Sequence, residues 1–184
     1  ATGDHSMAKF WDVLMQDEKE GGHGERSGAV GILETAMWDA IAKSEGLPLW
    51  ALLERELGHS QDDSTPAGQT VIYGSGGQYR PSESNLASIA DETKRTLDAG
   101  YAWFKVKVGG LSEVVDKSRI DAAIEASGTS QLIAVDANCG YRNENDWKCL
   151  QAIDHFDPRW IEEPVDPLDY QGLSAAAEEL KTPI

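Results

Sequence analysis

The sequence predicts an α/β protein with parallel strands, organised as the first half of a (β/α)8 barrel of the TIM type. Apolar runs typical of buried strands alternate with helical patterns over residues 70–184. They form four strand–helix units that repeat about every 25–35 residues, which indicates a parallel sheet. Polar residues follow every strand, and barrels carry their chemistry at these C-terminal strand ends. An open doubly wound sheet fits the same alternation, but would concentrate the polar residues at one switch point.

The elements of this half barrel follow from hydrophobic periodicity and from glycine and proline stop signals. Strands are expected at 71–73, 103–108, 132–138 and 160–165, and helices at 84–98, 112–126, 144–154 and 171–181.

The N-terminal third is expected to be helical, with helices at 7–19, 29–44 and 47–53. The helix 29–44 has one apolar face and is followed by Gly46 and Pro48, which are typical helix-ending residues. A polar stretch then separates it from the barrel. We therefore expect a helical end of a capping domain at 1–58, a linker at 59–69 and the half barrel at 70–184.

Composition excludes several classes of partner. The chain has 184 residues, with 16 Lys and Arg against 32 Asp and Glu, a net charge of −16. This excess argues against binding to nucleic acid or to an anionic membrane. Cys139 and Cys149 are too few for a disulfide framework, and no apolar run approaches the roughly 20 residues of a membrane span. The sequence therefore predicts a cytoplasmic protein.

The second predicted strand carries two lysines, Lys105 and Lys107, between apolar residues. Because side chains alternate along a strand, both lysines point to the same face. Two ammonium groups in an apolar strand are costly unless an anionic group meets them. The sequence therefore predicts an anion-binding site, and one lysine is a candidate base.

Carboxylates are expected on the next two strands, at Asp136 and Glu162. Neighbouring strands lie roughly 5 Å apart, so the two side chains can share one ion. Two hard oxygen ligands favour Mg²⁺. A divalent cation lowers the pKa of a nearby lysine, which can then remove a proton from carbon. Enolase-type sites combine a lysine base with Mg²⁺ in this manner.

Each of these residues also has a simpler interpretation. The lysines could form salt bridges with the carboxylates, or one lysine could form a Schiff base. Asp136 could cap the following helix. Asn138 and Ser75, with Tyr73 and Tyr79, could line a substrate pocket or only complete loops.

Taken together, these motifs resemble those of the enolase superfamily, in its mandelate racemase and muconate-lactonizing branch. The resemblance covers essentially the whole chain and depends on Lys105-Val106-Lys107, Val135-Asp136-Ala137-Asn138 and Trp160-Ile161-Glu162-Glu163-Pro164. Further stretches resemble the D-tartrate dehydratase group of that superfamily: 21–27, 76–77 and 166–170.

The resemblance implies a Mg²⁺-dependent dehydratase that removes the proton next to the carboxylate of an acid sugar. Lys107 would be the base and Lys105 would hold the substrate carboxylate. Asp136 and Glu162 would bind the metal, while Asn138 and Ser75 would contact substrate. A racemase, epimerase or cycloisomerase of the same superfamily is the alternative, as is an inactive fragment.

The superfamily pattern also requires groups that this sequence does not contain. A third carboxylate ligand is expected roughly four residues after Ile184, at one barrel repeat. We therefore expect the chain to be a fragment of a longer enzyme. A half barrel exposes apolar strand edges, so association into a homo-oligomer is expected as well.

Overall fold

The computed structural model describes residues 7–18, 24–57, 70–79, 86–142 and 144–184. The chain divides into two compact units, Ala1–Thr70 and Val71–Ile184. The predicted linker at 59–69 lies outside the described residues, as does the glycine-rich stretch 21–23.

The first unit consists of three helices, α1 (Met7–Leu14), α2 (Glu25–Glu45) and α3 (Leu49–Leu57). The helix α2 ends at Gly46, whose φ of 69° lets its N–H reach the Lys43 carbonyl at 3.2 Å. The helix α1 is shorter than predicted, because a turn follows it in which Asp17 has a φ of 62°.

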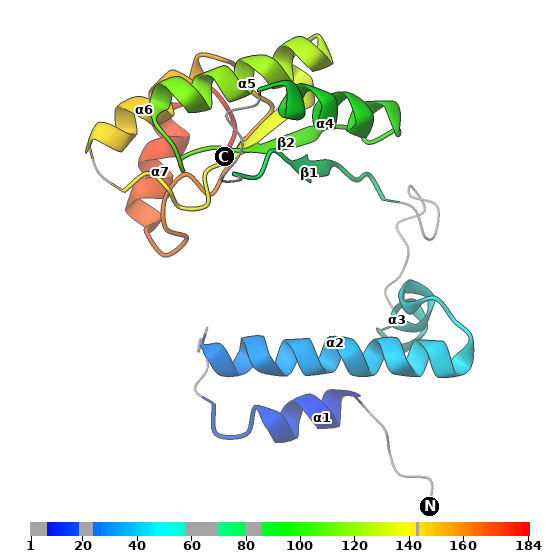
Figure 1. The fold of residues 1–184 in the computed structure, drawn as a ribbon. Coiled ribbons are helices and arrows are strands. Elements are labelled where there is room, and N and C mark those ends of the chain that lie inside the picture. The colour runs from blue at the N-terminus through cyan, green and yellow to red at the C-terminus, as the bar shows by residue number, and fades with distance from the viewer. Residues whose placement is uncertain (1–6, 19–23, 58–69, 80–85, 143) are drawn as a thin grey trace, which may run out of the picture. The chain divides into compact units, whose positions relative to one another are not determined.

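The second unit is a sheet of four parallel strands in the order β1-β2-β3-β4. The strands are β1 (Gly74–Gly76), β2 (Phe104–Lys107), β3 (Ile133–Asp136) and β4 (Ile161–Glu162). Each is followed by a helix: α4 (Leu86–Asp98), α5 (Glu113–Ser127), α6 (Glu144–Asp154) and α7 (Tyr170–Glu179). A short 3-10 helix, η1 (Ser130–Leu132), leads into β3. This architecture, drawn in Figure 1, confirms the predicted half barrel.

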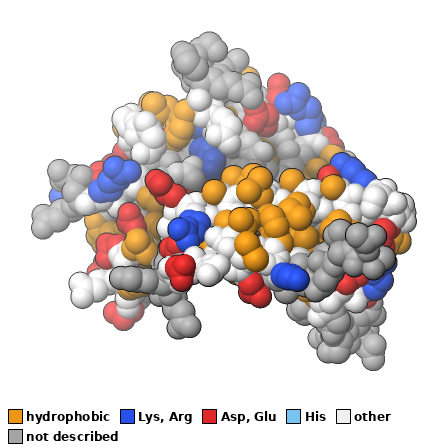
Figure 2. Space-filling model, turned by 90° about the horizontal axis from the view of Figure 1, so that it is seen from below, with side chains coloured by type: hydrophobic (Ala, Val, Ile, Leu, Met, Phe, Trp, Pro, Cys, Tyr) orange, Lys and Arg blue, Asp and Glu red, His pale blue; other side chains and the backbone are white. Residues whose placement is uncertain are grey.

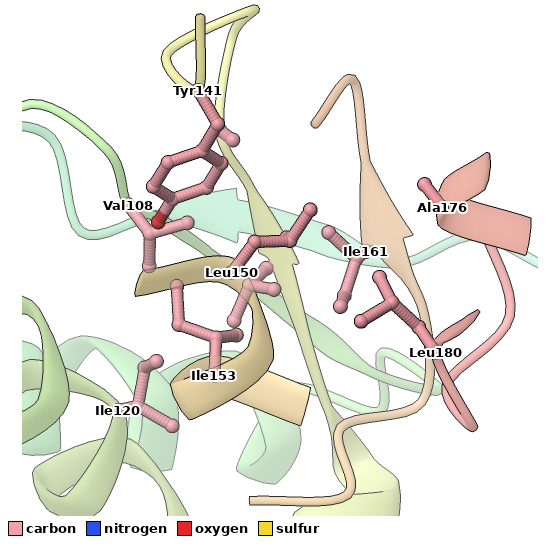
Figure 3. Packing of buried hydrophobic residues seen from close by; sticks show 10 residues of the cluster. Val108, Ile120, Tyr141, Leu150, Ile153, Ile161, Ala176 and Leu180 are labelled. Atoms are coloured by element: carbon pink, nitrogen blue, oxygen red, sulfur yellow. The ribbon is translucent and has the colours of Figure 1, made fainter. Parts of the chain in front are cut away.

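The hydrophobic core lies between the sheet and its helices. One cluster joins Val135 of β3 and Ile161 of β4 to Leu150 and Ile153 of α6, all at most 1% exposed. Figure 3 shows Leu150 and Ile153 of α6 among the side chains of this cluster. A second cluster packs Phe104 of β2 against its neighbouring strand and helices. Alternation along the strands leaves the opposite face of the sheet for polar side chains.

The position of β1 differs from the prediction. The apolar residues 71–73 were expected to form the strand, but it comprises Gly74–Gly76. The helix α4 approaches so closely that a Cβ atom on Gly74 would lie 2.2 Å from Thr96 Cγ2. Only glycine allows this approach, and hydrophobicity therefore misplaced the strand.

The last residues lie alongside β4. The backbone N–H groups of Lys181 and Thr182 donate to Asp154 Oδ1 at 3.1 and 2.9 Å. The N–H of Ile161 donates to the Pro183 carbonyl at 2.8 Å. Burial would raise the pKa of Asp154, but hydrogen bonds from Thr182 and Lys181 lower it. Asp154 therefore anchors the segment that borders the strand carrying Glu162.

Several large hydrophobic side chains remain exposed in both units. In the first unit they include Ile32 at 74% and Trp50 at 50%, and in the second Val71 at 70% and Val114 at 74%. Figure 2 shows hydrophobic side chains gathered in a patch on the viewed face. None of the helices in the described ranges combines the length and apolar character of a membrane span.

A substitution in β1 tests its close contact with α4 and β2. In Gly76→Ala the new Cβ would lie 2.8 Å from the Phe104 ring and 2.6 Å from Glu92 Oε2. We expect a loss of about 1–3 kcal/mol in the free energy of unfolding, measured in urea. The control is Ser75→Ala at the neighbouring exposed position, which should change it by less than about 0.5 kcal/mol.

The Asp154 anchor predicts a pH dependence of stability. Its pKa is lowered in the folded protein, so the stabilisation is present above the ordinary aspartate pKa of about 3.9 and is lost as pH falls below it. Between pH 5 and pH 3, as a rough window, wild type should lose more stability than Asp154→Asn. Parallel pH dependences of the two melting temperatures would contradict this assignment.

Candidate active site

The strand β2 directs both lysines to the sheet face opposite its core residues. Phe104 and Val106 are at most 1% exposed in the hydrophobic cluster, and Lys105 and Lys107 alternate with them. Lys105 is 7% exposed as a residue. The flanking apolar residues therefore hold the two lysines on the inner face, where an ammonium group needs an anionic partner.

The partners come from the next two strands. Lys107 is in register with Asp136, and Asp136 is in register with Glu162. Lys107 Nζ lies 2.6 Å from Asp136 Oδ2. Lys105 Nζ lies 3.0 Å from the same oxygen and 2.7 Å from Glu162 Oε1. The four side chains therefore form one ion-paired group, which we call the charged layer.

Burial and pairing act in opposite directions on the pKa values in the charged layer. Burial favours neutral Lys105, but hydrogen bonds to Glu162 and Asp136 outweigh it and raise its pKa. Burial likewise opposes the Asp136 carboxylate, yet the two lysines and the Asn138 N–H lower its pKa. Lys105 is therefore held as a cation.

The structure places Asn138 beside this layer and Ser75 at its edge. The backbone N–H of Asn138 donates to Asp136 Oδ1 at 3.0 Å, and its side-chain amide donates to Glu163 Oε2 at 3.1 Å. Ser75 is exposed on β1, in register with Lys105. Asn138, like Ser75, is exposed. Glu163, which sequence analysis did not single out, becomes the partner of Asn138.

An aromatic group lies next to the charged layer. The rings of Tyr73 and Trp160 meet edge to face at 5.0 Å, and Trp103 contacts Trp160 at 6.1 Å. Lys105 Nζ lies 5.5 Å from the centroid of the Tyr73 ring, and the Trp160 indole donates to Glu162 Oε2 at 3.3 Å. These rings directly precede three different strands, so their contact could not be read from the sequence.

The loops after β1 and β2 are joined by a buried polar network. Tyr79 donates to Asp116 Oδ1 at 2.7 Å, and the Gly109 N–H donates to Asp116 Oδ2 at 2.8 Å. The guanidinium of Arg119 lies 4.4 Å from the Tyr79 ring centroid and donates to the Gly77 carbonyl. Asp116 and Arg119 are at most 3% exposed. Tyr79 therefore completes these loops, one of the two roles left open by the sequence.

The donor set fits part of a divalent metal site. Asp136 Oδ2 and Glu162 Oε1 both lie within hydrogen-bonding distance of one ammonium nitrogen, so both oxygens already converge on a single cation. Carboxylate oxygens are ligands that Mg²⁺ prefers. Across the parts of the chain that the structure describes, however, no three His, Cys, Asp or Glu side chains are grouped for a metal. Among the described residues, Asp136 and Glu162 are therefore two candidate ligands, fewer than a divalent ion requires.

A parallel half barrel with lysines and acids on its inner face defines an α/β barrel fold, and comparison with known proteins identifies the family. Residues 88–184 match the family described as "Enolase C-terminal domain-like". The chain therefore belongs to the enolase superfamily, in its mandelate racemase and muconate-lactonizing branch, as its motifs predicted.

Individual relatives are similar over nearly the whole chain. It is 31% identical to an arabinonate dehydratase of Saccharolobus solfataricus over 95% of this chain and 44% of that protein. It is 32% identical to an L-talarate/galactarate dehydratase of Salmonella typhimurium, covering 95% and 41%. An L-talarate dehydratase from Polaromonas sp. JS666, complexed with Mg and L-glucarate, superposes with a TM-score of 0.67 at 26% identity, covering 96% and 46%. The chain thus spans less than half the length of these relatives.

Removing the shared ammonium tests whether the two carboxylates form a cation site. In Lys105→Met, Asp136 and Glu162 lose a common partner. We therefore expect the free energy of unfolding, measured in urea, to fall by about 3 kcal/mol. Mg²⁺ should restore part of this loss, because a divalent ion that binds the folded state stabilises it.

The control for this experiment is Lys117→Met, whose ammonium forms an exposed pair with Glu113 at 3.6 Å. It should change stability by less than about 0.5 kcal/mol, with or without Mg²⁺. An equal response of both variants to Mg²⁺ would rule out a cation site at Asp136 and Glu162.

Proposed function

We propose that the full-length protein is a Mg²⁺-dependent acid-sugar dehydratase, which converts a sugar acid into a 2-keto acid. The observation that supports this most directly is the charged layer, in which a lysine pair faces two carboxylates on successive strands. The names of the relatives, arabinonate and L-talarate/galactarate dehydratase, favour dehydration of this substrate class. D-tartrate is the first candidate substrate, given the resemblance of the loops.

Each residue of the charged layer has one role in this proposal. Asp136 and Glu162 hold the divalent ion, which supplies positive charge when bound and stabilises the substrate anion that forms. Lys105 binds the substrate carboxylate as a cation. Lys107, on the same strand face, takes the proton from the carbon next to that carboxylate.

The overall reaction balances without an oxidant. Lys107 Nζ accepts the α-proton, and the electron pair left on the α-carbon forms a double bond to the β-carbon. The β-hydroxyl leaves as water after a general acid has protonated it, and the resulting enol rearranges to a 2-keto acid. In this proposal Asn138, which follows β3, and Ser75 of β1 contact substrate hydroxyl groups.

A racemase or epimerase is the second candidate, because other relatives are named D-Ala-D/L-Ala epimerase and N-succinyl-L-Arg/Lys racemase. It would use the same proton abstraction but return a proton to the opposite face, with no loss of water. A cytoplasmic location and a homo-oligomeric state remain part of the proposal, and the exposed apolar side chains favour the latter.

Lys107→Ala in the full-length protein tests the proposed base. With D-tartrate and a panel of sugar acids in deuterated water, wild type should form a 2-keto acid and exchange the α-proton. The variant should lower both rates by about 10²–10⁴-fold, because general base catalysis contributes that much. Exchange is followed by NMR and the keto acid by a colorimetric hydrazone assay.

The surface variant Lys117→Ala is the matched control and should retain both rates. Wild-type exchange without keto acid would favour the racemase or epimerase. Undiminished exchange in Lys107→Ala would show that another group is the base.

A further inference from the structure

Three residues other than glycine adopt left-handed backbone conformations just after Asp136 and Glu162 in the chain. Asn138 and Cys139 follow β3 with φ values of 44° and 60°, and Glu163 follows β4 with a φ of 47°. Such conformations are costly for L-residues and persist where surrounding contacts impose them. Two adjacent strands thus end in strained turns at the same edge of the sheet.

The contacts that impose these turns run between the two strand ends. The side-chain amide of Asn138 donates to Glu163 Oε2 at 3.1 Å, and the backbone N–H of Cys139 donates to the Glu163 carbonyl at 2.8 Å. Further along both segments, the Tyr141 N–H donates to the Pro164 carbonyl at 3.2 Å. We call the side-chain bond between Asn138 and Glu163 the tether.

The tether acts on both acids of the charged layer. The Asn138 N–H donates to Asp136 Oδ1 at 3.0 Å, so the backbone conformation of Asn138 orients that carboxylate. The turn at Glu163 directs its carboxylate to Asn138, and Glu162 alone of the two glutamates meets Lys105, at 2.7 Å. Asn138 and Glu163 are both exposed, so the tether affects local geometry more than overall stability.

We infer that Asn138 and Glu163 are positioning residues whose hydrogen bond fixes Asp136 relative to Glu162 and thereby sets the affinity for a divalent ion. This inference rests on the proposed function, in which those two carboxylates hold the ion. It gives Asn138 a role that needs no contact with substrate. It also assigns a role to Glu163, the second acid of its pair, without making it a ligand.

The experiment measures metal affinity directly, in the full-length protein and without substrate. Tb³⁺ is a hard-cation probe, and its emission is sensitised by nearby tryptophans such as Trp160, whose indole donates to Glu162. Asn138→Gly removes the tether while permitting the left-handed backbone. We expect it to weaken Tb³⁺ and Mg²⁺ binding about tenfold, as loss of a group that orients a ligand does.

Two comparisons isolate the tether. Glu163→Gln and Glu163→Ala remove the same charge, but only glutamine retains an oxygen that can accept from Asn138, so the alanine variant should bind more weakly. Gln131→Ala is the matched control, because its amide donates to the Asp157 carbonyl at 2.9 Å and joins the same two strands at their opposite ends. It should bind the ion as wild type does.

The outcomes separate this inference from the proposed function. If Asp136→Asn abolishes binding while Asn138→Gly binds as wild type does, the metal site stands and the tether has no role. Equal weakening in Asn138→Gly and Gln131→Ala would also overturn the tether, since any link between the strands would then suffice. If Asp136→Asn binds as wild type does, the proposed metal site is wrong and the inference fails with it.

Discussion

The structure of the second unit depends on one electrostatic requirement, that two ammonium groups on β2, one of them buried, meet carboxylates on β3 and β4. Lys105 is 7% exposed and Asp136 is 1% exposed, so neither charge is stable in its position without the other. The parallel register places Lys107 opposite Asp136 and Asp136 opposite Glu162. A shift of one residue in any strand would turn these side chains into the hydrophobic core.

Core packing and contacts between the loops stabilise that strand register. On the helix side, apolar residues of the strands pack against the helices, so the charged side chains have only the inner face available. At the strand ends, Asp116 and Arg119 bind the loops after β1 and β2, while Asn138 and Glu163 join those after β3 and β4. Strained or buried polar groups thus concentrate at the edge where the proposed chemistry takes place.

Local patterns predicted most elements because their causes are local. Apolar runs predicted β2 and β3, and Gly46 and Gly128 end their helices in the left-handed conformation typical of a helix stop. The prediction for β1 was wrong: the strand comprises Gly74–Gly76, where the close approach of Thr96 of α4 leaves no room for a side chain on Gly74, and hydrophobicity does not signal such a strand. The position of Glu163, likewise, depends on hydrogen bonds between the residues that follow β3 and those that follow β4, which the sequence does not show.

The sequence by itself determined the parallel α/β class, the family motifs, and the residues that supply two lysines and two carboxylates. These follow from periodicity and residue type, which any chain segment carries without its neighbours. Only the tertiary structure decided that Lys105 bridges Asp136 and Glu162, that aromatic rings from the residues preceding three strands lie beside them, and that Asn138 binds Glu163. Such contacts join residues far apart in the chain, and only the strand register brings them together.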